Sequence, residues 1–184
     1  DLARKYGGST EAAVSYGLAS TEGLALLENA VEEVSRLVVE HGKLMPGVSE
    51  TIAMLRHENY ALAVASSSPL QLIRTALEKF AIIELFSVLH SAEFEEKGKP
   101  DPAVYLSAMS RLGFEPDDCV AFEDSVPGVR AAKSAGARVI AVPDPVDISN
   151  PGFAAADGEE IIGDEIERDV VWQTGSHVAS LAGK

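Results

Sequence analysis

The sequence has 184 residues, 46% of them hydrophobic, which suits one ordinary domain with a sizeable apolar core. Fifteen Lys and Arg against 29 Asp and Glu give a formal net charge of -14, which would repel nucleic acid and anionic membranes. No apolar run approaches the roughly 20 residues that span a bilayer, no signal-like segment opens the chain, and Cys119 is the single cysteine. We therefore expect no nucleic-acid or membrane partner, no internal disulfide and a cytoplasmic setting.

The chain up to Gly42 is predicted to be helical, because apolar residues between Leu24 and Val38 recur at intervals of three and four. Pro46 and Gly47 break this pattern, and a short helix is expected at 48–59. Apolar strands then alternate with helices. The expected strands are 60–65, 86–89, 119–122 and 138–142, with a last edge strand at 160–162; the expected helices are 70–80, 101–112 and 126–135. This alternation predicts a parallel α/β sheet.

Ligands of open α/β sheets bind at the carboxyl ends of the strands, so the polar residues there are the candidates for a site. Ser66 and Ser67 follow the first strand at the start of a helix, where free N–H groups favour an anion such as phosphate. The alternative is that residues 66–68 only cap the helix.

Lys99 stands in a turn that enters the next helix, where its cation would neutralise a phosphate or a buried carboxylate. The alternative is a surface lysine. Its bond to Pro100 is a candidate for a cis peptide, since such bonds are retained in ligand-binding turns.

Glu123 and Asp124 come directly after the buried strand 119–122. Adjacent carboxylates at a strand end suit Mg2+, with Gly128 allowing close approach of the following helix. The alternative, compatible with the first, is that Asp124 or Ser125 caps that helix.

The histidines, one group of acidic residues and the single cysteine are expected to have no role in a site. The four histidines, His41, His57, His90 and His177, have no ligand spacing and are interpreted as surface or structural residues. The acidic residues Glu93, Glu95 and Glu96 are interpreted as a solvated turn, and Cys119 as a small core residue.

The segments VASSSP, GKPDPAVY and VAFEDSVPGVRAAKSAG, in this order and spacing, resemble the haloacid dehalogenase superfamily. They are most similar to its hexitol-phosphate and 2-deoxyglucose-6-phosphate phosphatases and to beta-phosphoglucomutase. The resemblance implies a Rossmann-like α/β core at 44–165, part of a helical cap at 1–43 and an unassigned tail at 166–184.

The resemblance also implies roles for individual residues. Ser66 would bind the transferring phosphoryl group with Ser67 beside it, and Lys99 would steady the phosphate and the nucleophile. Asp124 would ligate Mg2+ with support from Glu123. The implied activity is a Mg2+-dependent phosphatase of small phosphorylated metabolites, sugar or sugar-alcohol phosphates, acting as a monomer through an aspartyl-phosphate.

The sequence departs from the family at its first motif, because no Asp-x-Asp pair occurs in it. The resemblance places that pair on a strand between the strands ending at Ala65 and Phe122, and we expect this strand to lie upstream of Asp1. Its loss would leave two unpaired inner edges, with 170–173 as a possible substitute strand. The alternatives to the phosphatase are therefore a phosphomutase, or a non-catalytic fragment or degenerate relative that only binds phosphate and metal.

Overall fold

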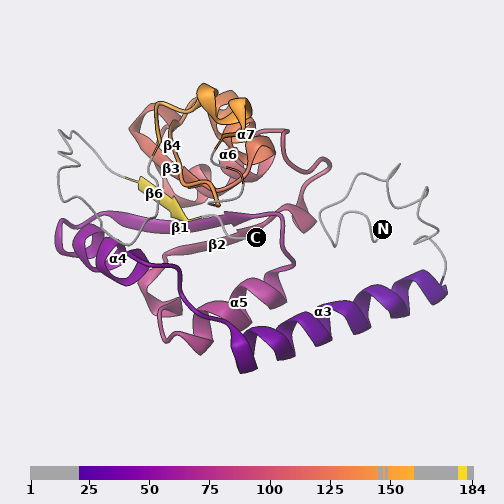
Figure 1. Cartoon of the computed structure of the whole chain (residues 1–184). Helices are drawn as coiled ribbons and strands as arrows, with labels where there is room; N and C mark the ends of the chain where they lie inside the picture. The colour runs from indigo at the N-terminus through magenta and orange to yellow at the C-terminus, as the bar shows by residue number, and fades with distance from the viewer. Residues whose placement is uncertain (1–20, 145–146, 148, 160–177, 182–184) are drawn as a thin grey trace.

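The computed structural model describes residues 21–144, 147, 149–159 and 178–181. Within them, six strands form one sheet in the order β2-β1-β6-β3-β4-β5 (Figure 1), and every neighbouring pair is parallel. The α/β class with a parallel sheet, predicted from the alternation of strands and helices, is confirmed.

The elements lie close to their predicted positions. The helices are α3 (Thr21–His41), α4 (Val48–His57), α5 (Leu70–Lys79), α6 (Ala103–Leu112) and α7 (Val126–Ala135), and the strands are β1 (Ala61–Ser66), β2 (Val88–Ser91), β3 (Cys119–Glu123), β4 (Arg138–Ala141), β5 (Gly158–Glu159) and β6 (Val178–Leu181). Strand β2 begins two residues later than expected, and the 3-10 turn η1 (Ile83–Leu85) precedes it. The predicted strand at 160–162 lies outside the described residues.

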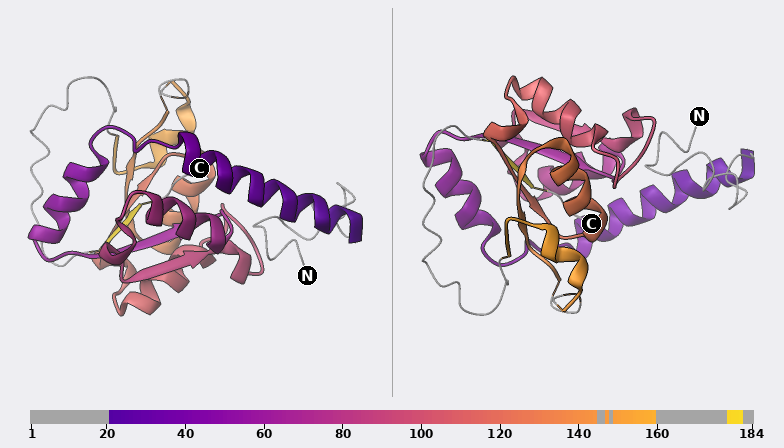
Figure 2. Two further views of the ribbon diagram at one scale, coloured as in Figure 1. Left: turned by 90° about the horizontal axis from the view of Figure 1, so that it is seen from below. Right: turned by 90° about the horizontal axis from the view of Figure 1, so that it is seen from above.

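Helices cover both faces of the sheet (Figure 2), which explains why its strands are apolar on both sides. On one face, α6 packs over β1 and β2 and α7 packs over β3 and β4, around buried residues that include Ala65 and Ala121. On the other face, α4 and α5 bury Leu62 and Val64 of β1 together with Phe122. Cys119 is a buried core residue, as expected, and burial, with a smaller contribution from nearby carboxylates, raises the pKa of its thiol to about 11.

The expectation of a sheet with unpaired inner edges was wrong. Strand β6, from the C-terminal tail, lies between β1 and β3 and pairs with both. It contacts the amino-terminal half of β1, with Ala61–Ala63 opposite 178–180, and residues 119–122 of β3. The stretch 178–181 satisfies backbone groups that would otherwise be buried without partners. The segment 170–173, considered as a substitute strand, lies outside the described residues.

Helix α3 runs past the edge of the sheet and packs on α5 (Figure 1). Its last turn is held by Lys79 of α5, whose Nζ donates hydrogen bonds of 2.7 Å to the carbonyl oxygens of Val38 and Gly42. A cation at a helix C-terminus also interacts favourably with the helix dipole. Among the described residues, no helix has the length and apolar character needed to cross a membrane.

Candidate active site

The candidate residues at the strand ends share one edge of the sheet. Ser66, Ser91 and Glu123 are the last residues of β1, β2 and β3, which run parallel. All three side chains are buried, at 3% exposure or less. Buried polar groups at the carboxyl edge of a parallel sheet are the usual setting of a ligand site in this architecture.

The Glu123 carboxylate is the centre of this cluster. Its Oε1 accepts hydrogen bonds from the Lys99 ammonium and, at 2.5 Å, from the Tyr105 hydroxyl. Its Oε2 accepts from the backbone N–H of Ser125 at 3.2 Å and from the Ser125 hydroxyl at 3.0 Å. Both oxygens of a carboxylate only 1% exposed are therefore compensated by donors, one of them a cation.

Gly128 and Ser125 explain how α7 approaches this carboxylate so closely. A Cβ built on Gly128 would lie 2.0 Å from the side-chain atoms of Glu123, so any larger residue would collide with it. Ser125 caps α7, because its hydroxyl oxygen accepts from the Gly128 N–H at 3.1 Å. Gly128 thus allows the close approach of α7 that the sequence predicted, and the predicted cap at Ser125 is also present.

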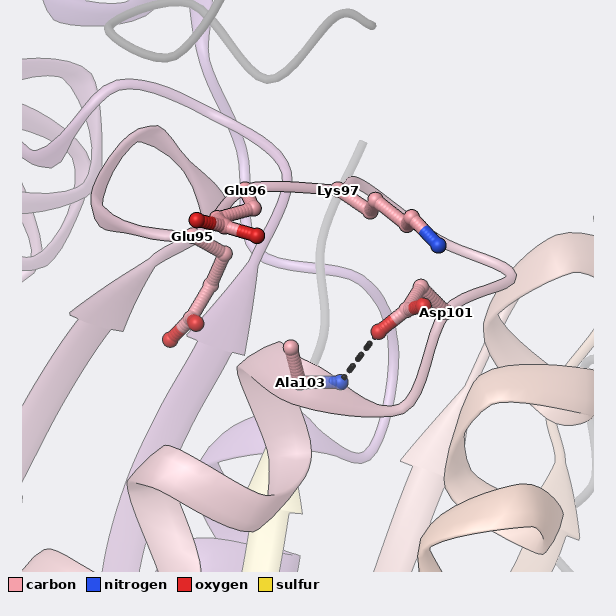
Figure 3. Close-up of a pocket in the computed structure, with 5 residues that line it drawn as sticks. All are labelled: Glu95, Glu96, Lys97, Asp101 and Ala103. Atoms are coloured by element: carbon pink, nitrogen blue, oxygen red, sulfur yellow. Dashed lines mark hydrogen bonds between the residues drawn. The ribbon is translucent and has the colours of Figure 1, made fainter.

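Lys99 is a buried lysine, and the surface alternative is excluded because its side chain is 8% exposed. It precedes α6 in a turn closed by a 3.1 Å hydrogen bond from Asp101 N to Gly98 O. The Asp101 carboxylate in turn accepts from Ala103 N (Figure 3). The Lys99–Pro100 bond is cis, as proposed from the sequence. A hollow of about 250 Å3 adjoins the turn and is lined by Glu95, Glu96, Lys97, Asp101 and Ala103.

Ser66 and Ser67 differ in their surroundings. Ser66 is buried and its hydroxyl accepts from the Ser68 N–H at 3.1 Å, whereas Ser67 is exposed. Neither serine caps α5, whose N-cap Pro69 makes no side-chain capping bond. The carboxylate of Glu93 accepts instead from Leu70 N at 3.3 Å. The capping alternative is therefore wrong, and the serines remain candidates for phosphate binding.

The fit of Mg2+ rests on Asp124. Within the part of the chain that the structure describes, no group of three or more His, Cys, Asp or Glu side chains could hold a metal ion. Both oxygens of Glu123 already accept hydrogen bonds, which leaves little room for it as a direct ligand. Mg2+ commonly uses only one or two carboxylates with water and phosphate oxygens, so a site built on Asp124 with Glu123 in support stays a prediction.

Sequence reasoning missed a second buried pair. His90 is 1% exposed, and its Nε2 lies 2.5 Å from Glu95 Oε1. Burial acts to raise the pKa of Glu95, but hydrogen bonds from Ser107 and His90 outweigh it and hold that pKa below its usual value. The histidines were interpreted as surface or structural residues, and the buried His90 is structural. The interpretation of Glu95 as part of a solvated turn was wrong, because its carboxylate is paired with His90.

Tyr105 was also missed as part of the site. It lies in the quoted segment GKPDPAVY, and its spacing to Ala108 and Met109 places it on the buried face of α6. That pattern predicts a core aromatic residue. Only the tertiary structure shows its hydroxyl between Lys99 and Glu123.

Comparisons with known proteins show which family this chain resembles. A family model described as haloacid dehalogenase-like hydrolase matches residues 1–142. Hexitol phosphatase B of Escherichia coli K12 is 39% identical over 132 residues, which cover 72% of this chain and 60% of that protein. Beta-phosphoglucomutase of Bacillus subtilis is 38% identical over 112 residues, covering 59% of this chain and 46% of that protein.

A solved structure is also similar to this chain in fold and in sequence. CbbY from Rhodobacter sphaeroides in complex with phosphate has a TM-score of 0.65 and 32% sequence identity, covering 71% of this chain and 59% of that chain. The chain thus spans about 60% of the length of hexitol phosphatase B and of CbbY.

Proposed function

Because the chain belongs to the haloacid dehalogenase-like hydrolase family, we propose that its whole protein is a Mg2+-dependent phosphatase of small phosphorylated metabolites. Sugar or sugar-alcohol phosphates are the proposed substrate class, supported by similarity to a hexitol phosphatase. We further propose residues 44–165 as the core and 1–43 as part of a helical cap.

The observation that carries this proposal is the buried Lys99 beside Glu123 at the carboxyl edge of the sheet. A lysine taken out of water needs a local anion, and Glu123 supplies it. The pair holds the Lys99 ammonium at the carboxyl edge of the sheet, the edge at which Ser66 ends β1. A phosphoryl group bound there would meet the cation, the serine hydroxyls and the N-terminus of α5.

The proposed reaction is a two-step phosphoryl transfer. One carboxylate of the Asp-x-Asp pair attacks phosphorus while the second, protonated carboxyl group gives its proton to the leaving sugar oxygen; water, giving a proton back to that second carboxylate, then hydrolyses the aspartyl-phosphate to free phosphate. No Asp-x-Asp pair occurs in this sequence, so the proposal requires the whole protein to supply that carboxylate. In these steps Lys99 and Ser66 would orient the phosphoryl oxygens, and Asp124 would hold Mg2+. When bound, Mg2+ would offset charge on those oxygens.

Release of inorganic phosphate by the whole protein tests this proposal. Hexitol phosphates, hexose 6-phosphates and a nucleoside monophosphate form the substrate panel, with and without Mg2+. Asp124→Asn and Lys99→Arg should each lower kcat by about 100-fold or more, by loss of transition-state stabilisation. The exposed Lys97, two residues from Lys99, supplies the control Lys97→Arg, which should stay within about twofold. Phosphate release from none of the panel, or full activity of Lys99→Arg, contradicts the proposal.

A phosphomutase is the second candidate, favoured by the similarity to beta-phosphoglucomutase. The two activities share the phosphoryl-enzyme and differ in what accepts its phosphoryl group. With beta-glucose 1-phosphate, a mutase would yield glucose 6-phosphate, and a phosphatase would yield glucose and phosphate. Product identification by NMR separates them.

The 184-residue chain assayed alone addresses the non-catalytic alternative. Its strand between β1 and β3 has the sequence VASL and carries no carboxylate, so the chain alone should bind phosphate without turning over any substrate. Turnover by the chain alone would show that another residue serves as the nucleophile.

A further inference from the structure

Tyr105 is the one aromatic residue that joins both halves of the buried ion pair among the residues described. It lies in the first turn of α6, six residues after Lys99, and is 0% exposed. Its ring packs in the apolar core between the sheet and α6. A phenylalanine would fill that space equally well, so the hydroxyl calls for a separate explanation.

The hydroxyl lies between Lys99 and Glu123. It donates to Glu123 Oε1 at 2.5 Å and accepts from Lys99 Nζ at 3.2 Å. Lys99 Nζ also lies 4.8 Å from the centre of the Tyr105 ring, within cation–π range. Burial and the neighbouring Glu123 charge raise the pKa of Tyr105 well above its usual value.

These contacts constrain the direction of the Lys99 ammonium. A lysine side chain has several rotatable bonds, and one carboxylate oxygen does not fix the orientation of three N–H groups. Tyr105 supplies two further contacts that restrict the orientation of the Lys99 ammonium, a second acceptor in its hydroxyl and the face of its ring. Within the described residues, Lys99 Nζ has two acceptors, so a third N–H is left for a substrate oxygen.

We propose that Tyr105 is a positioning residue, whose hydroxyl holds the Lys99 ammonium against Glu123 so that one N–H is presented at the phosphoryl site. Its effect on turnover rests on the proposed function. Its effect on Lys99 itself does not, because the three side chains are in contact whatever the substrate is.

Competitive amine labelling of the whole protein tests the effect on Lys99. The reagent is limiting acetic anhydride at neutral pH, and labelling at each lysine is read by peptide mass spectrometry. Tyr105→Phe keeps the ring and removes only the hydroxyl, so Lys99 should be labelled about tenfold faster, matching the loss of one hydrogen bond to a charged group. Lys97, exposed in the same turn, is the internal control and should not change.

Turnover is the second readout. Tyr105→Phe should lower kcat about tenfold with KM within about twofold, because the lost orientation matters most as charge develops on the phosphoryl oxygens. Tyr60→Phe, at the opposite end of β1, should leave both constants unchanged.

The labelling and turnover measurements distinguish failure of the positioning role from failure of the proposed phosphatase function. If no substrate is turned over, faster labelling of Lys99 alone still supports the positioning role while the phosphatase proposal fails. Unchanged labelling of Lys99 overturns the positioning role whatever the activity. Parallel gains at Lys97 and Lys99 also overturn it, since they would show general loosening of the turn.

Discussion

Removing the lysine of the buried pair should destabilise the protein strongly. Lys99→Met leaves Glu123, 1% exposed, without the cation that compensates its charge. Breaking a buried pair at one partner costs about 3–5 kcal/mol, and the remaining donors, Tyr105 and Ser125, place the expected loss toward the lower end. Because whole domains have about 5–15 kcal/mol of stability, this loss would be a large fraction of the total.

Guanidinium unfolding at neutral pH, followed by far-UV circular dichroism, measures this loss. The control Lys97→Met removes an equal charge from an exposed position in the same turn and should change stability by less than about 0.5 kcal/mol. The double variant Lys99→Met/Glu123→Gln should regain most of the loss, because no buried charge is left uncompensated. A loss below about 1 kcal/mol for Lys99→Met, or strictly additive effects in the double variant, would refute the assignment of Lys99 and Glu123 as a coupled buried pair.

Three further perturbations address other parts of the structure. Gly128→Ala should cost about 3 kcal/mol or more in guanidinium unfolding, because its Cβ would lie 2.0 Å from Glu123; an unchanged midpoint would contradict the close approach of α7. Ser180→Pro, which removes a backbone donor from central strand β6, should cost about 3 kcal/mol or more while Ser180→Thr should not; equal stability of the two variants would show that β6 is dispensable. Glu95→Gln should be less stable than wild type at neutral pH. Because the folded-state pKa of Glu95 is depressed, this difference should narrow as pH falls below 4.5, and a difference that is the same at pH 7 and pH 3.5 would refute the charged role of Glu95.

The stability predictions also bear on function. Lys99, Glu123, Tyr105 and Gly128 form one packed unit, in which three elements meet at the carboxyl edge of the sheet. A variant of this unit can lose activity by unfolding or by misplacing the cation. Measuring turnover and stability on the same variants separates these causes, and Tyr105→Phe is the most informative because it removes a single oxygen.

The central position of β6 has a further consequence for the candidate site. Strand β1 continues to Ser66, but β6 pairs only with Ala61–Ala63 of it. The described part of β6 therefore leaves the carboxyl-terminal half of β1 without a partner on that side, whereas on β3 it reaches as far as Phe122. The carboxyl edge, with Ser66 and Glu123, is where the proposal requires a carboxylate from the rest of the protein.

The sequence by itself determined the features that depend on local chemistry. Apolar strands alternating with periodic helices predicted the parallel α/β fold, because each element must bury an apolar face. The segments that contain Lys99 and Glu123 indicated the family, which the matching family model confirmed. The cis bond before Pro100 and the serine cap of α7 were also expected from local sequence, and both are present.

The tertiary structure decided what depends on contacts between distant residues. The sequence VASL in the tail has no local signal that distinguishes it from a loop, and it becomes a strand because β1 and β3 offer backbone groups on both sides. Tyr105 follows the pattern of a core residue, and its role comes from a hydroxyl that meets a carboxylate 18 residues away. His90 and Glu95 are only five residues apart, but the burial that makes them a pair comes from packing against the rest of the fold.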